Sequence, residues 1–144
     1  MLRDIYHKLA TLISVLPQVL TATIASPTAV ELDDAEGVNF DITVGTSGGT
    51  LDGSNYVDFI LQDSPDGSTW TIVTNTKYVL GLTPDSSGIV ATVDDAAEDD
   101  TNYRLGYLGP QRFARIVPTV TGAGVSLPIC INATKGYKHR DALV

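Results

Sequence analysis

Cysteine is almost absent from this sequence of 144 residues. Cys130 is the only one, so no disulfide can form within the chain, and we expect a protein that is made in a reducing compartment. The two histidines, His7 and His139, belong to neither an HxxxH nor an HExxH pattern. The sequence therefore predicts no zinc site, and nothing else in it indicates a cofactor.

Long apolar runs and dense charge are missing as well. No segment reaches the roughly 18 apolar residues that a membrane-spanning helix needs, so we expect no membrane partner. Charged residues make up only 18% of the chain, whereas about a quarter is typical of globular proteins. The 13 glycines and 7 prolines suit a turn-rich β protein, and the length is that of one domain.

Sequence signatures of catalysis are also lacking. The chain has no GxSxG, no GxxxxGK[ST] and no strand–GxGxxG–helix unit. The glycine-rich stretch at residues 45–50 opens no helix, so it lacks the amide array that binds phosphates. The acidic runs 31–37 and 94–100 lack the ligand spacing of an EF-hand, although a calcium ion in one of these loops stays an alternative. We therefore expect a protein that is not an enzyme.

Positive charge is scarce in the middle of the chain. Residues 9–103 hold 15 acidic residues and one base, Lys77, which gives −14. The two ends, residues 1–8 and 104–144, hold eight bases and two acids, which gives +6. An acidic body repels phosphates, so the sequence predicts no nucleic-acid partner. The basic ends could contact an acidic protein surface, or the acidic loops could simply keep the protein in solution.

The first 17 residues carry apolar side chains at spacings of three and four. This spacing predicts an amphipathic helix that ends at Pro17. A helix of about 15 residues is marginal alone in water, so its apolar stripe must dock on its own domain or on a neighbouring subunit. A secretory signal is the alternative, and Asp4, His7 and Lys8 argue against it. The stripe consists of Leu2, Ile5, Tyr6, Leu9, Leu12, Ile13 and Leu16.

The rest of the chain has the pattern of short strands. Apolar and polar residues alternate with period two, and Gly, Pro, Asn and Asp interrupt them at regular intervals. This pattern predicts an all-β fold, a β-sandwich or jelly roll with a short N-terminal helix or arm. The strands are expected at residues 19–25, 28–32, 38–44, 56–63, 69–73, 87–93, 103–108, 113–120 and 126–133. In the two clearest strands the residues expected to face inward are Val38, Phe40, Ile42, Val44, Val57, Phe59 and Leu61.

These strands divide the chain into three parts. We expect an N-terminal arm over residues 1–18, a β-sandwich body over 19–134 and a basic tail over 135–144. Candidate contact residues in the tail are Lys135, Tyr137, Lys138 and Arg140. The arm and the tail are therefore expected to clasp other protein subunits.

The polar stretch DSPDGS, residues 63–68, predicts a hairpin turn. Pro65 presets φ, Asp66 can accept bonds from its own backbone, and Gly67 supplies a positive φ. A metal or sugar site in the same loop is the alternative. Trp70 follows the turn at a position that is typical of the core.

Two later segments bear on recognition. Residues 107–115, YLGPQRFAR, are expected to form a hairpin that brings Arg104, Arg112 and Arg115 close together. Such arginines could form bidentate pairs with carboxylates across an interface, or they could be solvated. The tyrosines of residues 103–108 share one strand face and could be core or a sugar platform.

Two motifs resemble a known type of jelly roll. Residues 64–73, SPDGSTWTIV, and residues 112–119, RFARIVPT, resemble a hairpin and a later strand of discoidin-type, galactose-binding-like domains. The resemblance implies a carbohydrate-binding module that adheres to host or environmental glycans. It carries over no particular binding residue.

A second resemblance extends over nearly the whole chain. Its motifs are RDIYH (3–7), PQVLTAT (17–23), the stretch 30–42, LQDSPDGSTWTIV (61–73) and YRLGYLGPQRFARI (103–116). In order and spacing they resemble the small β-rich proteins encoded beside the major capsid protein in tailed bacteriophages and prophages. The resemblance implies a decoration or cement protein on the capsid exterior, typically trimeric and without catalytic residues.

The sequence thus favours a structural virion protein that is made in the host cytoplasm and bridges neighbouring major capsid proteins as a homotrimer. Two alternatives remain open. One is the glycan-binding module, and the other is a tail or neck component of the same virion.

Overall fold

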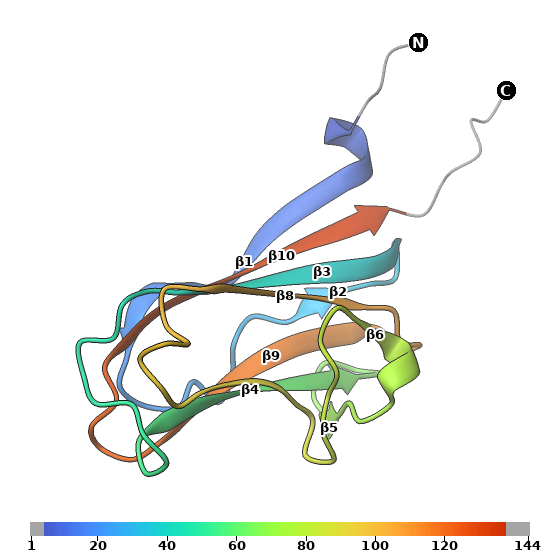
Figure 1. Ribbon diagram of the computed structural model, residues 1–144. Coiled ribbons are helices and arrows are strands. Elements are labelled where there is room, and N and C mark those ends of the chain that lie inside the picture. Colours follow the sequence, from blue (N-terminus) through green and yellow to red (C-terminus); the bar gives the residue numbers. More distant parts are fainter. Residues whose placement is uncertain (1–4, 138–144) are drawn as a thin grey trace, which may run out of the picture.

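The computed structural model describes residues 5–137, which form two antiparallel β-sheets packed face to face (Figure 1). Sheet A has the strand order β1-β10-β3-β8-β6, and sheet B has the order β2-β9-β4-β5, with β7 also paired to β4. The strands are β1 (Leu9–Leu20), β2 (Val30–Glu31), β3 (Ala35–Val44), β4 (Tyr56–Ser64), β5 (Thr71–Ile72), β6 (Val79–Leu80), β7 (Ile89–Val93), β8 (Asn102–Tyr107), β9 (Phe113–Thr121) and β10 (Leu127–Tyr137). Two 3-10 turns, η1 (Tyr6–Lys8) and η2 (Thr76–Tyr78), are the helical elements of the described chain.

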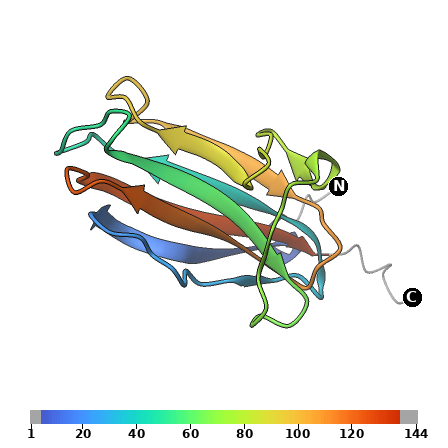
Figure 2. The same ribbon diagram turned by 90° about the horizontal axis from the view of Figure 1, so that it is seen from below.

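The topology is that of a jelly roll. Strands β1, β3, β8 and β10 lie in sheet A, while β2, β4 and β9 lie in sheet B, so the chain alternates between the layers. Figure 2 shows the layers from below, with yellow β7 beside green β4. The predicted all-β sandwich is confirmed.

The core fills the space between the sheets. All seven residues predicted to face inward from β3 and β4 are buried, because alternate side chains of a strand point to opposite faces. Phe40, Phe59 and Tyr107 are among the largest of the fully buried side chains. The Tyr107 hydroxyl donates to the buried Asp63 carboxylate at 2.7 Å, which links strand β8 of sheet A to β4 of sheet B. Burial, followed by this hydrogen bond, raises the pKa of Tyr107.

The predicted N-terminal helix is wrong within the described residues. Beyond the single turn of η1 the chain is strand β1, which pairs with β10 from Leu9 to Leu20. Register shifts on either side of Val15 mark bulges, and Pro17 is tolerated because β1 is an edge strand. Residues 9–18 therefore belong to the sandwich, and the expected strand at 19–25 retains only its first two residues.

The predicted turn at residues 63–68 is confirmed. Ser64 Oγ accepts the N–H of Gly67 at 2.9 Å, and Gly67 has a φ of 76°. One oxygen of Asp66 accepts the N–H groups of Ser68 at 2.8 Å and Thr69 at 2.7 Å. These bonds, the one from Thr69 first, lower the pKa of Asp66 to about 2. The carboxylate is thus used to build the turn.

Candidate interaction surfaces

Exposed apolar side chains gather near the start of the described chain. Ten large apolar side chains are exposed within residues 5–137, and six of them lie between residues 5 and 19. Tyr6 is 85% exposed and Leu16 is 65% exposed. We call residues 5–19 the apolar edge segment. Its exposed apolar members are Ile5, Tyr6, Leu9, Ile13, Leu16 and Val19.

The apolar edge segment contains six of the eleven predicted contact residues that the structure describes. Five of the seven residues of the predicted stripe are exposed there: Ile5 and Tyr6 at the turn η1, and Leu9, Ile13 and Leu16 on strand β1. Leu12 is half-buried and packs against the core. Leu2 and Arg3, like Lys138 and Arg140 of the predicted tail, lie outside the described residues.

Strand β1 is an outer edge of sheet A, and part of that edge is covered by the chain itself. The N–H of Thr28 donates to the carbonyl oxygen of Ser14 at 3.0 Å, and Ser14 Oγ donates to the carbonyl oxygen of Thr28 at 2.6 Å. Residues 9–13 pair with β10 on one side, and no described strand pairs with their other side. This part of the edge is therefore open.

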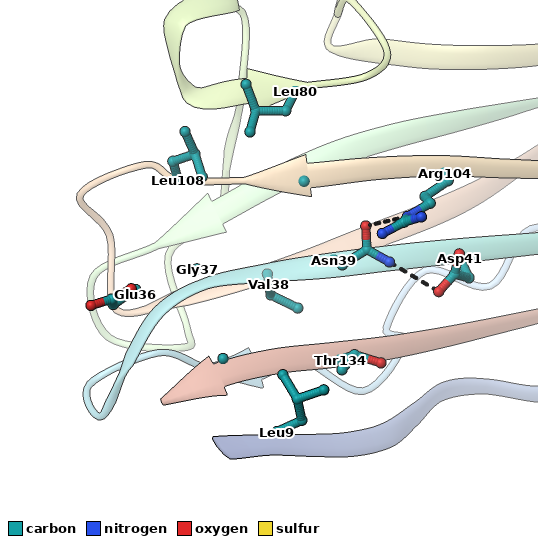
Figure 3. A pocket seen from close by; sticks show the side chains of 12 residues that line it. Leu9, Glu36, Gly37, Val38, Asn39, Asp41, Leu80, Arg104, Leu108 and Thr134 are labelled. Atoms are coloured by element: carbon teal, nitrogen blue, oxygen red, sulfur yellow. Dashed lines mark hydrogen bonds between the residues drawn. The ribbon is translucent and has the colours of Figure 1, made fainter. Parts of the chain in front are cut away.

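A shallow hollow of about 590 Å³ lies on the outer face of sheet A beside this edge (Figure 3). Leu9 stands on one side of it, and Leu80 and Leu108 stand on the other. Three glycines from neighbouring strands contribute to its lining: Gly37, Gly106 and Gly136.

The glycines of the hollow differ in whether the surrounding structure leaves room for a side chain. A Cβ at Gly37 would lie 2.9 Å from the carbonyl oxygen of Tyr107, so the fold itself requires a glycine there. A Cβ at Gly136 would meet nothing within 4 Å. The internal packing therefore does not explain why Gly136 lacks a side chain.

Polar groups cross the middle of the hollow. Arg104 Nε donates to the Asn39 side-chain oxygen at 3.0 Å, and Asn39 Nδ2 donates to Asp41 at 3.0 Å (Figure 3). These three side chains are hydrogen-bonded to one another. A partner in the hollow would therefore meet glycines, leucines and polar side chains that already have hydrogen-bond partners in this chain.

The predicted cluster of three arginines does not form. Tyr107 ends β8 in sheet A and Phe113 begins β9 in sheet B, so residues 108–112 cross between the layers and are not a hairpin. Arg104 faces outward from sheet A, whereas Arg115 faces outward from sheet B beside Gln62. The inward-facing Tyr107 and its bond to Asp63 fix this crossing.

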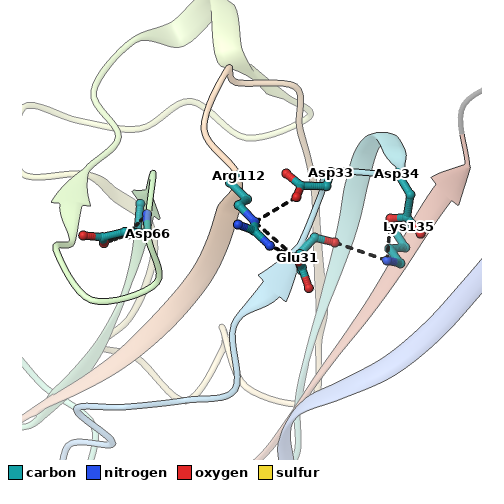
Figure 4. Close-up of polar contacts among 7 residues, drawn as sticks. Glu31, Asp33, Asp34, Asp66, Arg112 and Lys135 are labelled. Atoms are coloured by element: carbon teal, nitrogen blue, oxygen red, sulfur yellow. Dashed lines mark hydrogen bonds and ion pairs between the residues drawn. The ribbon is translucent and has the colours of Figure 1, made fainter.

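Arg112 and Lys135, two of the predicted contact residues, lie near each other around the turn before β3 (Figure 4). Arg112 pairs with Glu31 and, at 2.9 Å, with Asp33. Lys135 pairs with Asp34 at 2.8 Å and donates to the carbonyl oxygen of Glu31. The hydrogen bond to Glu31 and the charge of Asp33 raise the pKa of Arg112. Both bases are thus partnered within their own chain.

Trp70 is not in the core, so its predicted burial is wrong. The ring is half-buried, and the guanidinium of Arg115 lies 3.9 Å from the ring centroid. Arg115 Nε also donates to Gln62 at 2.9 Å, and burial lowers the pKa of Arg115. Sequence pattern could not reveal this stack, because β4 and β9 bring Gln62 and Arg115 together over a long separation in the chain.

The two tyrosines that could have formed a sugar platform belong to the core. Tyr107 is fully buried. Tyr103 is half-buried against the core, and its hydroxyl donates to the carbonyl oxygen of Glu98 at 2.8 Å. Burial, followed by the charge of Glu98, raises the pKa of Tyr103.

The carboxylates of residues 94–100 order their own loop. Asp95 accepts the N–H of Ala97 at 2.7 Å, and Asp99 accepts the N–H of Ser47 at 2.8 Å. Across residues 5–137 no group of three or more His, Cys, Asp or Glu side chains is placed to hold a metal ion. Over the same residues, no helix is long and apolar enough to cross a bilayer.

Comparison with known proteins adds no assignment. No model of a known protein family matches the chain, and a search of curated proteins finds no match either. The candidate function therefore depends on the surfaces described above.

Proposed function

We propose that this protein is a structural component that decorates and cements the exterior of a tailed-phage capsid. In this role it bridges neighbouring major capsid proteins as a homotrimer. The observation that supports the proposal most is the apolar edge segment, which leaves six large apolar side chains in water on one short part of the chain. Covering such a patch with protein is favourable, and patches of this kind mark interaction sites.

The positions of the chain ends and of the apolar edge segment give the proposed contact a direction. Gly136 pairs with Leu9, so the described chain begins and ends at the same end of the sandwich (Figure 1). The bases of residues 138–140 follow that end in the sequence. The acidic run 94–100 precedes Asn102, which pairs with Thr43 at the opposite end of β3. The acidic run 31–37 also lies at the terminal end, where Glu31, Asp33 and Asp34 pair with Arg112 and Lys135. We therefore expect the terminal end to face the shell because of the apolar edge segment, and the loop 94–100 to face solvent.

Co-sedimentation with capsid shells tests the proposal. Shells are assembled from the major capsid protein encoded in the same genome and are mixed with the full-length chain. We expect the chain to pellet with the shells, and we expect Tyr6→Asp and Leu16→Asp to lose that association because each places a charge in the apolar contact. Ile72→Asp is the matched control, since Ile72 is 41% exposed on β5 of sheet B, away from the proposed contact.

The results distinguish the outcomes clearly. Circular dichroism verifies that each variant is folded. Failure of the wild-type chain to pellet, or equal binding by all three variants and the wild type, would contradict the proposal. A tail or neck component would use the same surface, and the position of its density on an intact particle would separate it from a capsid decoration.

The glycan-binding alternative has less support. One face of the Trp70 ring lies under Arg115, and Tyr107 is buried. A sugar platform needs an accessible aromatic face. We therefore do not advance it as a second function.

A further inference from the structure

We infer that the open part of β1, residues 9–13, pairs antiparallel with the same residues of a second copy, about a two-fold axis at Thr11. The pairing joins two copies of sheet A into one continuous sheet. This inference rests on the proposed assembly role of the apolar edge segment, but it does not need a capsid.

The fold sets both limits of the open edge. On one side the turn η1 ends at Lys8, whose N–H donates to the carbonyl oxygen of Ile5 at 3.1 Å. On the other side Thr28 covers Ser14 through two hydrogen bonds. Between these limits residues 9–13 keep a regular register with β10. The unpaired side of such a strand offers a row of N–H and C=O groups to a further strand.

The sequence of the open edge is complementary to itself. In an antiparallel pair centred on Thr11, Leu9 lies opposite Ile13 of the second copy, and Thr11 lies opposite itself. Leu9 and Ile13 are 44% and 47% exposed in the single chain, so each would cover the other. On the second face of the strand Ala10 lies opposite Leu12. Apolar residues therefore meet on both faces of the new pair.

Other symmetric registers fit less well. A pair centred on Leu12 would bring Ser14 into the ladder, where Thr28 already occupies the edge. A pair centred on Ala10 would place Lys8 opposite Leu12 and would run into η1. Only the register centred on Thr11 uses all five open residues.

Charge and strand length also favour a second copy at this edge. Soluble β proteins commonly protect an edge with lysine, with proline or with a very short strand. The other edge of sheet A, β6, has only two residues, whereas β1 has twelve and carries no charged side chain. Pro17 lies beyond the open part. Two chains with a net charge of −8 each can therefore meet here without bringing carboxylates of this strand together.

The available surface is of a suitable size. Burying an apolar side chain of this kind removes roughly 100 Å² from water. Within the pair itself, Leu9 and Ile13 offer on the order of 200 Å² per copy. With the four flanking exposed side chains of the apolar edge segment the total is on the order of 500 Å², against roughly 800 Å² per partner in a standard interface, before the backbone of the edge is added. A two-fold contact of this kind is also compatible with trimers, because it can join one trimer to the next.

Charge-swap variants of the full-length chain test the pairing in solution without shells. Thr11→Lys and Thr11→Glu each place like charges face to face on the proposed axis, at an exposed position. Sedimentation equilibrium measures self-association of the wild type, each variant, an equimolar mixture of the two, and Ile72→Lys as the control on β5 of sheet B. We expect each Thr11 variant to weaken the two-fold association at least about tenfold. We expect the mixture to restore it and the control to match the wild type.

Several results would overturn the inference. One is that the wild-type chain sediments neither as a dimer nor as an oligomer that contains an even number of smaller oligomers, such as two trimers. Others are Thr11→Lys associating as the wild type does, or a mixture that associates no better than its components. Capsid binding retained under any of these results would leave the proposed function intact. Restored pairing without capsid binding would instead contradict the proposed function alone.

Discussion

The outer faces of the two sheets differ in how far the chain itself covers them. On sheet B the chain supplies its own cover: Arg115 lies over Trp70, and the turn at Gly67 lies so close to Phe113 that a Cβ added to Gly67 would be 3.5 Å from the Phe113 ring. On sheet A the outer face carries the hollow, and beside it no strand within residues 5–137 pairs with the outer side of residues 9–13. Both sheets pack on the same core, so burial within the monomer does not explain the difference. This difference is the reason why the proposed contacts are placed on sheet A.

The largest expected effect concerns whether β1 belongs to the body or to a detachable arm. Removing residues 1–17 deletes the buried Val15 and the partly buried Leu12 and exposes the edge of β10. We expect the free energy of unfolding to fall by roughly 3 kcal/mol or more, from lost burial alone. Urea unfolding followed by circular dichroism measures it. Removing only residues 1–8 is the control, and we expect little change; equal stability of the two truncations would show that β1 is an arm after all.

A second prediction compares two glycines of the hollow. Gly37→Ala places a Cβ 2.9 Å from a backbone oxygen, and we expect a loss of about 1–3 kcal/mol in stability. Gly136→Ala meets open space, and we expect it to be neutral or to stabilise by up to about 1 kcal/mol. Thermal unfolding of both variants gives the comparison. If Gly136→Ala leaves stability unchanged but weakens assembly, the hollow is in contact with a partner.

The inner side of this fold could be predicted from sequence, and the outer side largely could not. Period-two alternation identified the inward residues of β3 and β4, and the turn residues Pro65 to Gly67 were sufficient for the hairpin, because both signals are local. The start of the chain satisfies a helical spacing and a strand pattern equally, with β-branched Thr11, Ile13 and Val15 present. Pairing with β10, more than a hundred residues away, decided between them.

The surfaces depend on contacts between distant strands. The sequence selected Leu9, Ile13 and Leu16 as candidate contact residues, and the structure leaves all three side chains exposed. It could not show that Thr28 covers Ser14 or that Arg104 and Arg115 lie on opposite sheets. Both facts arise from the crossing of the chain between the layers, which no local pattern records.

A third prediction examines the cover of sheet B. Arg115→Ala removes the guanidinium from the Trp70 ring, and we expect a loss of about 0.5–1 kcal/mol, the size of a partly exposed cation–π contact. We also expect a change in the fluorescence of Trp70, the only tryptophan of the chain. Arg104→Ala on sheet A is the matched control and should leave that fluorescence unchanged. An unchanged spectrum in Arg115→Ala would mean that the ring is covered by something else.

The smallest expected effect is the pH dependence of the turn on sheet B. The pKa of Asp66 is about 2 in the folded chain and 3.8 without its hydrogen bonds, so the ionised form is favoured by folding. Its contribution to stability is therefore complete above about pH 4 and is lost as the pH falls towards 2. An NMR titration of the Asp66 carboxyl carbon measures the folded pKa directly. In Asp66→Asn, which keeps an acceptor but cannot titrate, the change in stability between pH 4 and pH 2 should be smaller than in the wild type. A folded pKa near 3.8 would show that the N–H groups of Ser68 and Thr69 do not hold the carboxylate. The turn would then not be a fixed part of the cover of sheet B, and the contrast with sheet A would be weaker.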